Sequence, residues 1–312
     1  MRITAMPTPD PADPAGLAGV LSAVATAEQA GFPRAWLPQL PFIPGLAAWD
    51  ALLALALAGQ QSTRIELATG VSIAYHQHPL TLARQALTTN AALTTDGVGR
   101  LTLGIGVSHP SMIEALGYSY ERPVRFLREY LEILNPALAG EPVDYHGTQL
   151  TAVGQVDLPG APPPPVVMAA LGPRMLDLAG SLTDGVVTAW AGRKTLEESV
   201  VPRITKAAAA AGRPDPQVIA GLLVMVTSDE AAARESIATA FAIAEQVPAY
   251  RAVLEAEGVG GVADVCIVGD ESHVEAALRQ FADIGVTEFA ATLHGGPETV
   301  ARTTALLTAL QR

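Results

Sequence analysis

The stretch that decides the fold is RIELATGVS (Arg64–Ser72), followed by His78-Pro79 and then by RLTLGIG (Arg100–Gly106), which ends in Val-Ser-His. Arg64–Ser72 and Arg100–Gly106 are both short and mainly apolar, which is typical of buried strands. The proline after His78 is suited to the first turn of a helix between them. Each strand has a glycine at or near its C-terminal end, where a parallel barrel carries its chemistry. The stretch therefore predicts a strand–helix–strand unit of a parallel sheet.

The rest of the chain repeats this alternation of strands and helices. The further strands expected are Arg2–Met6, Arg34–Gln39, Pro165–Ala170, Asp184–Trp190, Val218–Thr227 and Thr287–Leu293. Together with the first two they make eight, which favours a closed (β/α)8 TIM barrel over an open doubly wound sheet. No strand is followed by a Gly-x-Gly-x-x-Gly turn with an acidic residue at the expected distance, which argues against a dinucleotide-binding fold. We expect a single domain over residues 1–312.

Helices are expected between the strands, and one segment interrupts the alternation. The expected helices are Gly16–Ala30 closed by Gly31, Leu46–Gln60, Pro79–Leu93, Tyr120–Leu138, one opening at Gly172-Pro173, Lys194–Ala211, Glu230–Glu257, Ser272–Ile284 and Pro297–Leu310. Asn135-Pro136 predicts a break or kink in its helix. Residues 140–165, rich in glycine and proline, are interpreted as an insertion before the fifth strand, with Val143–Tyr145 and Gln155–Leu158 as an extended pair.

Composition excludes several classes of protein. The chain has 312 residues, 49% of them hydrophobic, and a net charge of −12 without a dense Lys/Arg run. Nucleic acid and anionic membranes are therefore unexpected partners. No apolar run reaches the roughly 18 residues of a membrane span, and no signal peptide is expected. The single cysteine, Cys266, fits a reducing cytoplasm and is expected to be a buried, inert thiol.

Side chains at the C-terminal strand ends of such a barrel share one cavity. They are Met6, Gln39, Gly70, Val71, Ser72, Ser108, His109, Ala170, Leu171, Gly172, Trp190, Thr227 and His294. This set lacks the carboxylate pair of a glycosidase and any nucleophile-elbow pattern. It offers small residues, an aromatic ring and neutral hydrogen-bonding groups. Such a set suits a flat, bulky cofactor that carries the chemistry itself.

Each candidate feature also has an ordinary structural interpretation. Gly70 marks either a bulge or tight barrel packing. Ser108 and His109 form either a hydrogen-bonding or proton-donating pair, or a capping serine beside a solvated histidine. Gly172-Pro173-Arg174 is either an anion site at a helix start or a plain loop-to-helix junction. Trp190 either stacks on a ring or fills the core.

A metal site is the weakest of these alternatives. His76-Gln77-His78 places two histidines two residues apart, as metal ligands on an extended segment can be. Barrel metal sites need further ligands at other strand ends, but the fifth and sixth strands end in Ala-Leu-Gly and Ala-Trp. We therefore expect no metal, with His78 starting a helix and His76 in a loop.

In order, these segments resemble a known family. They are HPLTLARQALTTNAALTTDGVGRLTLGIGVSH (His78–His109), AALGPRMLDLAG (Ala169–Gly180), DGVVTAW (Asp184–Trp190) and VGDESHVEAALRQFADIGVTEF (Val268–Phe289). The chain resembles the luciferase-like flavin and deazaflavin oxidoreductases, which are (β/α)8 barrels. The Ala169–Gly180 block is similar to the branch that uses coenzyme F420, a deazaflavin hydride carrier.

The resemblance implies roles for individual residues. Gly70-Val71 matches the non-proline cis peptide that backs the deazaflavin ring in relatives, with Ser72, Gly106 and Ala170 also expected at the cofactor. Leu171, Gly172 and Arg174 match the segment that holds the cofactor's phosphate tail. Gln39, Ser108 and His109 match positions around the reacting face, where we expect the catalytic groups, and Trp190 lies beside them.

Two departures from the family bear on the reaction. Relatives that oxidise sugar phosphates have a His at the end of the second strand and a Glu after the glycines of the fourth, where this chain has Gln39 and Ser108-His109. The resemblance therefore implies an F420-dependent reductase of a C=C or C=N bond in a small organic substrate, with His109 or a bound water as the proton source. The alternatives are an FMN-dependent monooxygenase supplied by a separate flavin reductase, and a non-catalytic cofactor-binding subunit. The family also suggests a homodimer.

Overall fold

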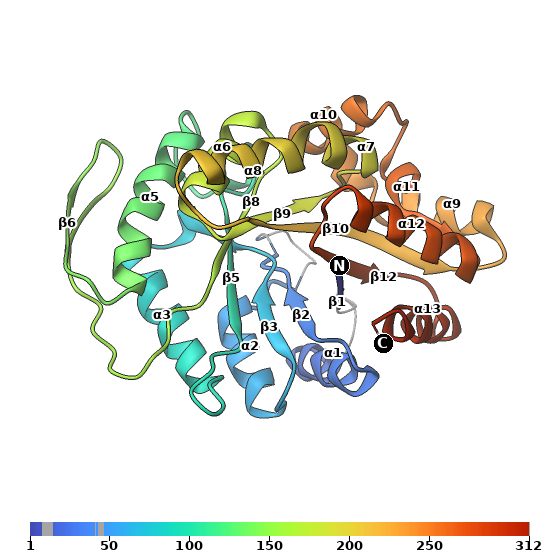
Figure 1. Ribbon diagram of the computed structural model, residues 1–312, viewed down its shortest axis with the longest axis horizontal. Coiled ribbons are helices and arrows are strands. Elements are labelled where there is room, and N and C mark those ends of the chain that lie inside the picture. Colours follow the sequence, from blue (N-terminus) through green and yellow to red (C-terminus); the bar gives the residue numbers. More distant parts are fainter. Residues whose placement is uncertain (8–14, 41, 43–46, 312) are drawn as a thin grey trace.

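The centre of the molecule is a closed barrel of parallel strands in this computed structural model, which describes residues 1–7, 15–40, 42 and 47–311. The strands follow one another around the barrel as β1 (Arg2–Met6), β2 (Arg34–Leu37), β3 (Glu66–Thr69), β5 (Leu101–Gly106), β8 (Val166–Ala169), β9 (Gly185–Ala189), β10 (Gln217–Val226) and β12 (Glu288–Leu293). Pairing of β12 with β1 closes the barrel, and helices surround it (Figure 1). The predicted (β/α)8 fold is confirmed.

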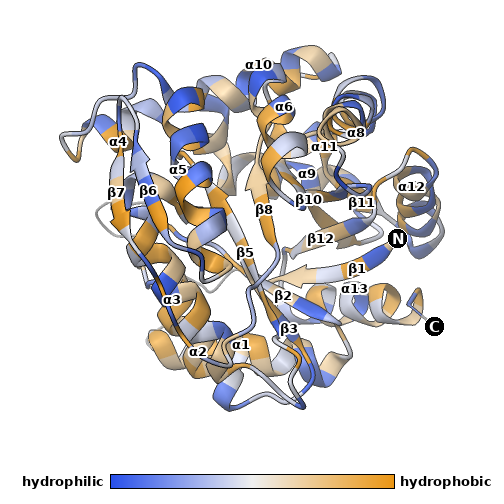
Figure 2. Ribbon diagram, turned by 60° about the vertical axis from the view of Figure 1, so that its left-hand side comes forward, coloured by the Kyte–Doolittle hydropathy of each residue, from blue (hydrophilic) through white to orange (hydrophobic). Residues whose placement is uncertain are grey.

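The interior of the barrel is filled by side chains from alternate positions of its strands, as the two-residue period of a strand requires. This plug consists of Trp36, Ala68, Val167, Val187, Ile219 and Ala290, with Met6, Val71 and Ala169 packed against it. Figure 2 shows hydrophobic residues along the barrel strands and more hydrophilic residues on the outer helices. The plug is solid, so a ligand has access only at the ends of the barrel.

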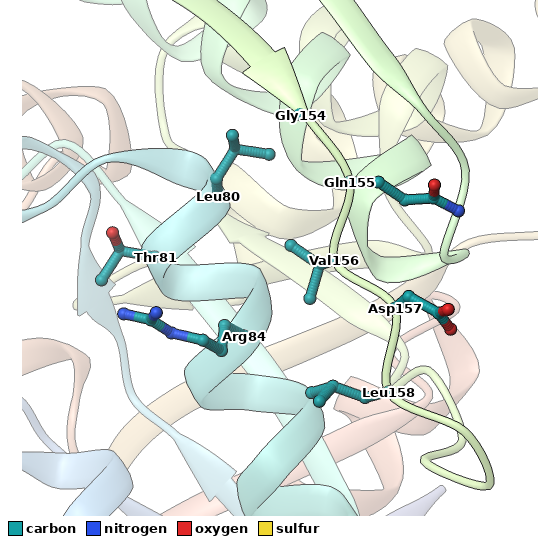
Figure 3. Close-up of a pocket in the computed structure, with 8 residues that line it drawn as sticks. All are labelled: Leu80, Thr81, Arg84, Gly154, Gln155, Val156, Asp157 and Leu158. Carbon is teal, nitrogen blue, oxygen red and sulfur yellow. The ribbon is translucent and has the colours of Figure 1, made fainter.

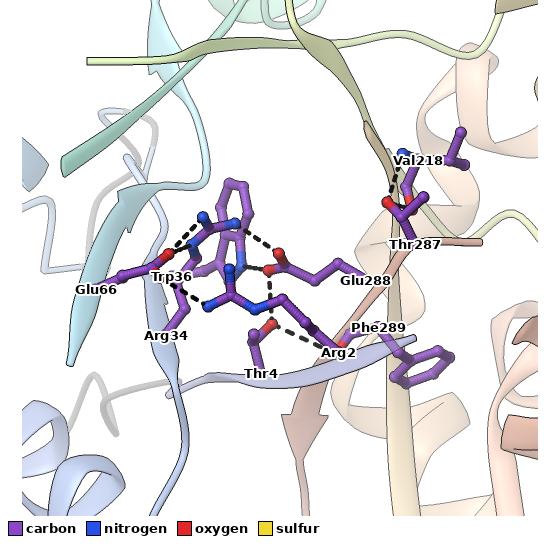
Figure 4. A network of polar contacts seen from close by, with 9 residues as sticks. All are labelled: Arg2, Thr4, Arg34, Trp36, Glu66, Val218, Thr287, Glu288 and Phe289. Atoms are coloured by element: carbon purple, nitrogen blue, oxygen red, sulfur yellow. Dashed lines mark hydrogen bonds and ion pairs between the residues drawn. The ribbon is translucent and has the colours of Figure 1, made fainter. Parts of the chain in front are cut away.

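A buried polar network seals the N-terminal end of the barrel (Figure 4). The Arg34 guanidinium lies between the carboxylates of Glu66 and Glu288, at 2.6 and 2.5 Å. Glu288 also accepts hydrogen bonds from the Trp36 indole (2.7 Å) and the Thr4 hydroxyl (2.9 Å). The two buried charges of this network, on Arg34 and Glu288, are therefore paired, and loss of one would leave the other unpaired in the core. This end is structural, which leaves the opposite end for chemistry.

The main helices are α1 (Leu17–Ala30), α2 (Ala51–Gln60), α3 (Pro79–Ala92), α5 (Pro123–Leu138), α6 (Pro173–Leu182), α8 (Val201–Ala210), α9 (Glu230–Ala240), α10 (Pro248–Glu257), α12 (Glu271–Asp283) and α13 (Pro297–Ala309). Proline lies in the first turn of α3, as predicted, and His78 caps that helix by accepting from the N–H of Leu80. Gly31 ends α1 in the left-handed conformation at φ 97°. The predicted start at Leu46 lies outside the described residues, and α2 begins after its cap Asp50.

Shorter elements complete the connections. They are β4 (Ser72–Ile73), the 3-10 turns Ala74–His76 and Ala242–Gln246, α4 (Pro110–Glu114), β6 (Val143–His146), β7 (Thr151–Gly154), α7 (Arg193–Thr195), the π-helical turn Leu196–Val200, α11 (Val262–Val265) and β11 (Ile267–Gly269). The predicted helix Glu230–Glu257 is thus divided into three segments. The strand β11, which pairs with the C-terminal half of β10, was not predicted from the sequence.

The insertion before the fifth barrel strand is present, but one of its predicted strands was wrong. β6 pairs with β7 at Thr151–Gly154 rather than with Gln155–Leu158. The reason is a tight turn after His146, held by the buried Glu129 carboxylate, which accepts from the N–H groups of Gln149 (2.8 Å) and Leu150 (3.0 Å). The prediction of a helix break at Asn135-Pro136 was also wrong, because α5 continues through Pro136 to Leu138.

None of the helices in the described part of the chain is long and apolar enough to cross a membrane.

Candidate active site

The first feature of the site is a bulge where β3 passes into β4. The Gly70–Val71 peptide bond is cis, as the family resemblance implied. Ala68 pairs with Thr102 and Ser72 pairs with Ile105, so β3–β4 contains one residue more than β5 between these pairs. The sequence interpretation of Gly70 as a bulge is therefore confirmed, rather than that of simple tight packing.

The bulge is fixed to β5 by close contacts. The Thr69 hydroxyl donates to the carbonyl of Gly104 (2.7 Å) and accepts from its N–H (2.9 Å). A Cβ on Gly104 would lie 2.0 Å from the Thr69 carbonyl oxygen, and one on Gly106 would lie 2.9 Å from Val71 Cγ2. Both glycines are therefore required by this packing. Ser72, which follows the bulge, is buried.

An apolar floor lies at the C-terminal end of the barrel. Met6, Val71 and Ala169 pack on the interior plug but are only partly buried. They come from the C-terminal ends of β1, the bulge and β8. Because these side chains are small or flexible and carry no charge, the floor suits the face of a flat aromatic ring.

Ser108 and His109 follow β5 and contact different parts of the chain. Ser108 has a positive φ of 58°, and its carbonyl accepts a hydrogen bond of 2.8 Å from the Tyr120 hydroxyl. His109 is the residue before α4, with its ring 5.0 Å from that of Tyr250 in an edge-to-face arrangement. Burial lowers the pKa of His109 below its usual value of 6.5. The imidazole is therefore mainly neutral at pH 7.

Gln39 and Trp190 stand at the C-terminal ends of β2 and β9. The Gln39 side-chain oxygen accepts from the N–H of Ala51 at 2.9 Å, so its amide helps to cap α2. Trp190 has a positive φ of 59°, and its ring lies 5.3 Å from that of Phe241. Trp190 is thus partly packed against an aromatic neighbour rather than fully exposed.

The segment after β8 leads into α6. Ala170 is buried and Leu171 packs partly on the core. Gly172 precedes the helix, and a Cβ there would meet nothing within 4 Å. Arg174, in the first turn, is exposed and forms no ion pair or hydrogen bond with the described residues. A free cation beside the N–H groups of a helix start is suited to an anionic group.

The predicted residues come from five neighbouring strand ends of the barrel, those of β2, β3–β4, β5, β8 and β9. Within the described part of the chain no side-chain hydrogen bond joins one of them to another. The rings of Trp190 and His109 instead contact residues that the sequence interpretation missed, Phe241 and Tyr250 respectively, both from the insertion between β10 and β11. The local sequence gave little indication of this role. Phe241 and Tyr250 lie on either side of Pro248, in the region Glu230–Glu257 that was predicted as helix.

The histidines considered as metal ligands are engaged otherwise. Nδ1 of His78 caps α3 and its Nε2 lies 3.0 Å from the Thr151 carbonyl. His76 packs against the ring of Phe42 at 5.2 Å. No three His, Cys, Asp or Glu side chains group as metal ligands among residues 1–7, 15–40, 42 and 47–311.

A separate pocket of about 310 Å³ lies between α3 and the chain around the end of β7 (Figure 3). Its lining residues are Leu80, Thr81, Arg84, Gly154, Gln155, Val156, Asp157 and Leu158. None of them belongs to a barrel strand or follows one directly. This pocket is therefore distinct from the strand-end site.

Comparison with known proteins identifies the family of this chain. The sequence matches the model of the luciferase-like monooxygenase family over residues 2–310. A 5,10-methylenetetrahydromethanopterin reductase of Methanolobus tindarius is 27% identical over 307 residues, which cover 87% of this chain and 89% of the relative. An F420-dependent hydroxymycolic acid dehydrogenase of Mycobacterium tuberculosis is 31% identical over 257 residues, covering 73% of this chain and 67% of the relative.

A solved structure has the same fold at lower identity. The oxygenating constituent of 3,6-diketocamphane monooxygenase from Pseudomonas putida, in complex with FMN, superposes with a TM-score of 0.79 at 17% identity, over 99% of this chain and 97% of that one. The family match over nearly the whole sequence, together with the barrel, shows that this chain belongs to the luciferase-like monooxygenase family and is an oxidoreductase.

Proposed function

We propose that this chain is an F420-dependent oxidoreductase that transfers hydride between the reduced deazaflavin and a C=C or C=N bond of a small organic substrate. The observation that carries the proposal is the bulge at Gly70-Val71 beside the open apolar floor. The relative from Mycobacterium tuberculosis, named as F420-dependent, supports this choice of cofactor.

The residues present fit such a cofactor. Val71, Met6 and Ala169 would lie against one face of the ring, since all three are apolar and partly open. Arg174 and the N–H groups at the start of α6 would hold the anionic tail. The glycine at 172 leaves space for a close approach of that tail to the backbone.

When bound, the deazaflavin would supply or accept the hydride at a ring carbon. The chain's own part is to position the substrate, exclude water and exchange the proton that accompanies the hydride. His109 is our candidate for that exchange, because its ring nitrogens form no hydrogen bond with any described residue and it follows the strand end at β5. A bound water is the alternative proton source. Gln39 and Ser108 would contribute neutral hydrogen bonds at the rim.

FMN is the second candidate cofactor, favoured by the Pseudomonas putida structure, which holds FMN on the same fold. With FMN the chain would be a monooxygenase supplied with reduced flavin by a separate reductase. The two differ in chemistry, because reduced flavin reacts with oxygen and the deazaflavin activates it poorly.

Titration of the purified protein with F420 and with FMN, followed by ring fluorescence, tests the proposal. We expect saturable F420 binding and weaker FMN binding. Tight FMN binding without affinity for F420 would overturn the F420 assignment. Binding of neither would favour a non-catalytic role. A turnover screen with reduced F420 under anaerobic conditions then separates an enzyme from a cofactor-binding subunit.

We also propose a cytoplasmic homodimer that functions as a single domain in each subunit, as the family resemblance suggests. Sedimentation equilibrium of the purified chain tests the dimer, and a monomer at micromolar concentration would contradict it.

A further inference from the structure

The insertion between β10 and β11 brings two aromatic side chains to three different barrel strand ends. The Phe241 ring lies 5.3 Å from that of Trp190 and 5.7 Å from that of His294. The Tyr250 ring lies 5.0 Å from that of His109. The insertion, residues 230–265, is thus part of the wall of the candidate active site.

The helix that carries Tyr250 is fixed in place at its far end. The Glu257 carboxylate, at the end of α10, accepts from the N–H groups of Lys194 (3.0 Å) and Thr195 (2.9 Å) and from the Thr195 hydroxyl (2.6 Å). A Cβ on Gly192 would lie 2.4 Å from the same carboxylate, so contact at this point is close. The position of Tyr250 is therefore defined by two sets of contacts. Its own ring contacts His109, which follows β5, and its helix is held by Lys194 and Thr195, which follow β9.

Tyr250 and His109 each retain unused hydrogen-bonding atoms. Neither the Tyr250 hydroxyl nor a His109 ring nitrogen bonds to any described residue. Among the described side chains, the Tyr75 hydroxyl is the single polar group that is both buried and without a hydrogen-bond partner. The unpartnered atoms of Tyr250 and His109 are therefore not fully buried. Two polar side chains from separate segments, with their rings 5.0 Å apart, are thus open to a ligand or to water.

Both groups are uncharged near neutral pH. Burial lowers the pKa of His109 and raises the pKa of Tyr250. No carboxylate or cation within the described chain forms an ion pair with His109. A pair of this kind supplies hydrogen bonds but no positive charge, so it would not compensate the desolvation of an anion.

We propose that Tyr250 and His109 together bind one uncharged hydrogen-bond acceptor of the substrate, a carbonyl oxygen or an imine nitrogen, with the Tyr250 hydroxyl as donor. This rests on the proposed function for the reaction at the site. It makes the β10–β11 insertion the source of a substrate-binding residue and assigns the site to neutral substrates, not to carboxylates or phosphates.

The test uses full-length protein saturated with oxidised F420, so that no turnover occurs. The probes are cyclohex-2-en-1-one, cyclohexene, which lacks the oxygen, and cyclohex-1-ene-1-carboxylate, which is charged. Their affinities are measured by saturation-transfer NMR. Tyr250→Phe removes the hydroxyl but keeps the ring against His109. Tyr145→Phe is the control, because Tyr145 lies on β6, where its hydroxyl donates to Glu132 of α5.

We expect the wild type and Tyr145→Phe to bind the enone about tenfold more tightly than cyclohexene, as one good hydrogen bond allows. In Tyr250→Phe this ratio should fall to about twofold with F420 affinity unchanged. Stronger binding of the carboxylate than of the enone, no preference for the enone in the wild type, or an unchanged ratio in Tyr250→Phe would each overturn the proposal. F420 binding is measured separately. If F420 does not bind and the apo-protein still shows the Tyr250-dependent preference, the proposed function fails and this inference stands.

Discussion

Gly106 and Val71 are fitted so closely that a Cβ atom on Gly106 would lie 2.9 Å from Val71 Cγ2. It would also lie 3.1 Å from the Cβ of Ala169. The last residue of β5 thus sets the position of two of the three side chains that form the apolar floor. This relationship connects barrel packing directly to the surface on which a cofactor ring would lie.

We expect Gly106→Ala to destabilise the protein and to weaken cofactor binding. The added methyl group must push Val71 or Ala169 aside, and overpacking of this kind costs about 1–3 kcal/mol. Urea unfolding measures the first effect and F420 fluorescence titration the second. Gly296→Ala is the control, because a Cβ there meets nothing within 4 Å. Unchanged F420 affinity in a destabilised Gly106→Ala would show that the floor does not contact the ring.

Glu129 should stabilise the β6–β7 insertion in a way that depends on pH. Burial alone would raise its pKa, but hydrogen bonds from Gln149, Thr148 and Leu150 outweigh this and lower the pKa to about 2. A lowered carboxyl pKa stabilises the fold above the unfolded value near 4.5, and that stabilisation is lost as the pH falls toward 2. We expect Glu129→Gln to lower the free energy of unfolding by about 2 kcal/mol at pH 7, and by less at pH 3.

Urea unfolding at a series of pH values measures this difference. Glu132→Gln, on the same helix, is the matched control, since Glu132 is exposed and, among the described residues, its side chain accepts a single hydrogen bond, from Tyr145. A loss of stability in Glu129→Gln that is the same at pH 3 and pH 7 would mean that the charge on Glu129 is not what holds the turn.

The fold could be predicted from local signals, because apolar runs, glycines and helix-start prolines each act within a few residues, whereas Gly70 alone left both a bulge and tight packing open. The strand–helix–strand unit over Arg64–Gly106 is the best example, although the cis bond within it came from family resemblance rather than from the residues themselves. The register of the β6–β7 hairpin could not be predicted, since Glu129 holds its turn from another element.

The walls of the site were predictable only in part. Trp190 and His109 could be named as candidates because strand ends converge in a barrel. Tyr250 was missed because its contact with His109 joins segments that lie far apart in the sequence. The capping of α2 by Gln39 likewise depends on where the following loop returns, which no periodicity encodes.

Arg174 should contribute to cofactor affinity but not to stability. It is exposed and unpaired within the described part of the chain, so Arg174→Gln removes a free cation without breaking a contact. We expect F420 affinity to fall about tenfold, as loss of one charge-assisted hydrogen bond predicts, and the salt dependence of binding to weaken. Arg193→Gln, which loses only its ion pair with Glu197, should leave affinity unchanged. Equal affinities for Arg174→Gln and wild type would place the anionic tail elsewhere.

His109 should give opposite pH profiles to the two directions of hydride transfer. Burial lowers its pKa below 6.5. Reduction needs the protonated imidazole as acid, so its kcat/KM should be highest below that pKa and fall as the pH rises through it. Oxidation needs the neutral imidazole as base, so its kcat/KM should be low at acid pH and reach a plateau above the same pKa.

The two profiles are measured with any substrate pair that the turnover screen identifies, in wild type and in His109→Gln, with F420 affinity checked at each pH. The variant should lose about 100-fold or more in kcat/KM and lack the limb set by the His109 pKa, because general acid–base catalysis contributes on that scale. Since Gln keeps a hydrogen-bonding side chain of similar size, folding and F420 binding should be preserved. Identical profiles in variant and wild type would assign proton exchange to a bound water, and His109 would then serve only to bind the substrate beside Tyr250.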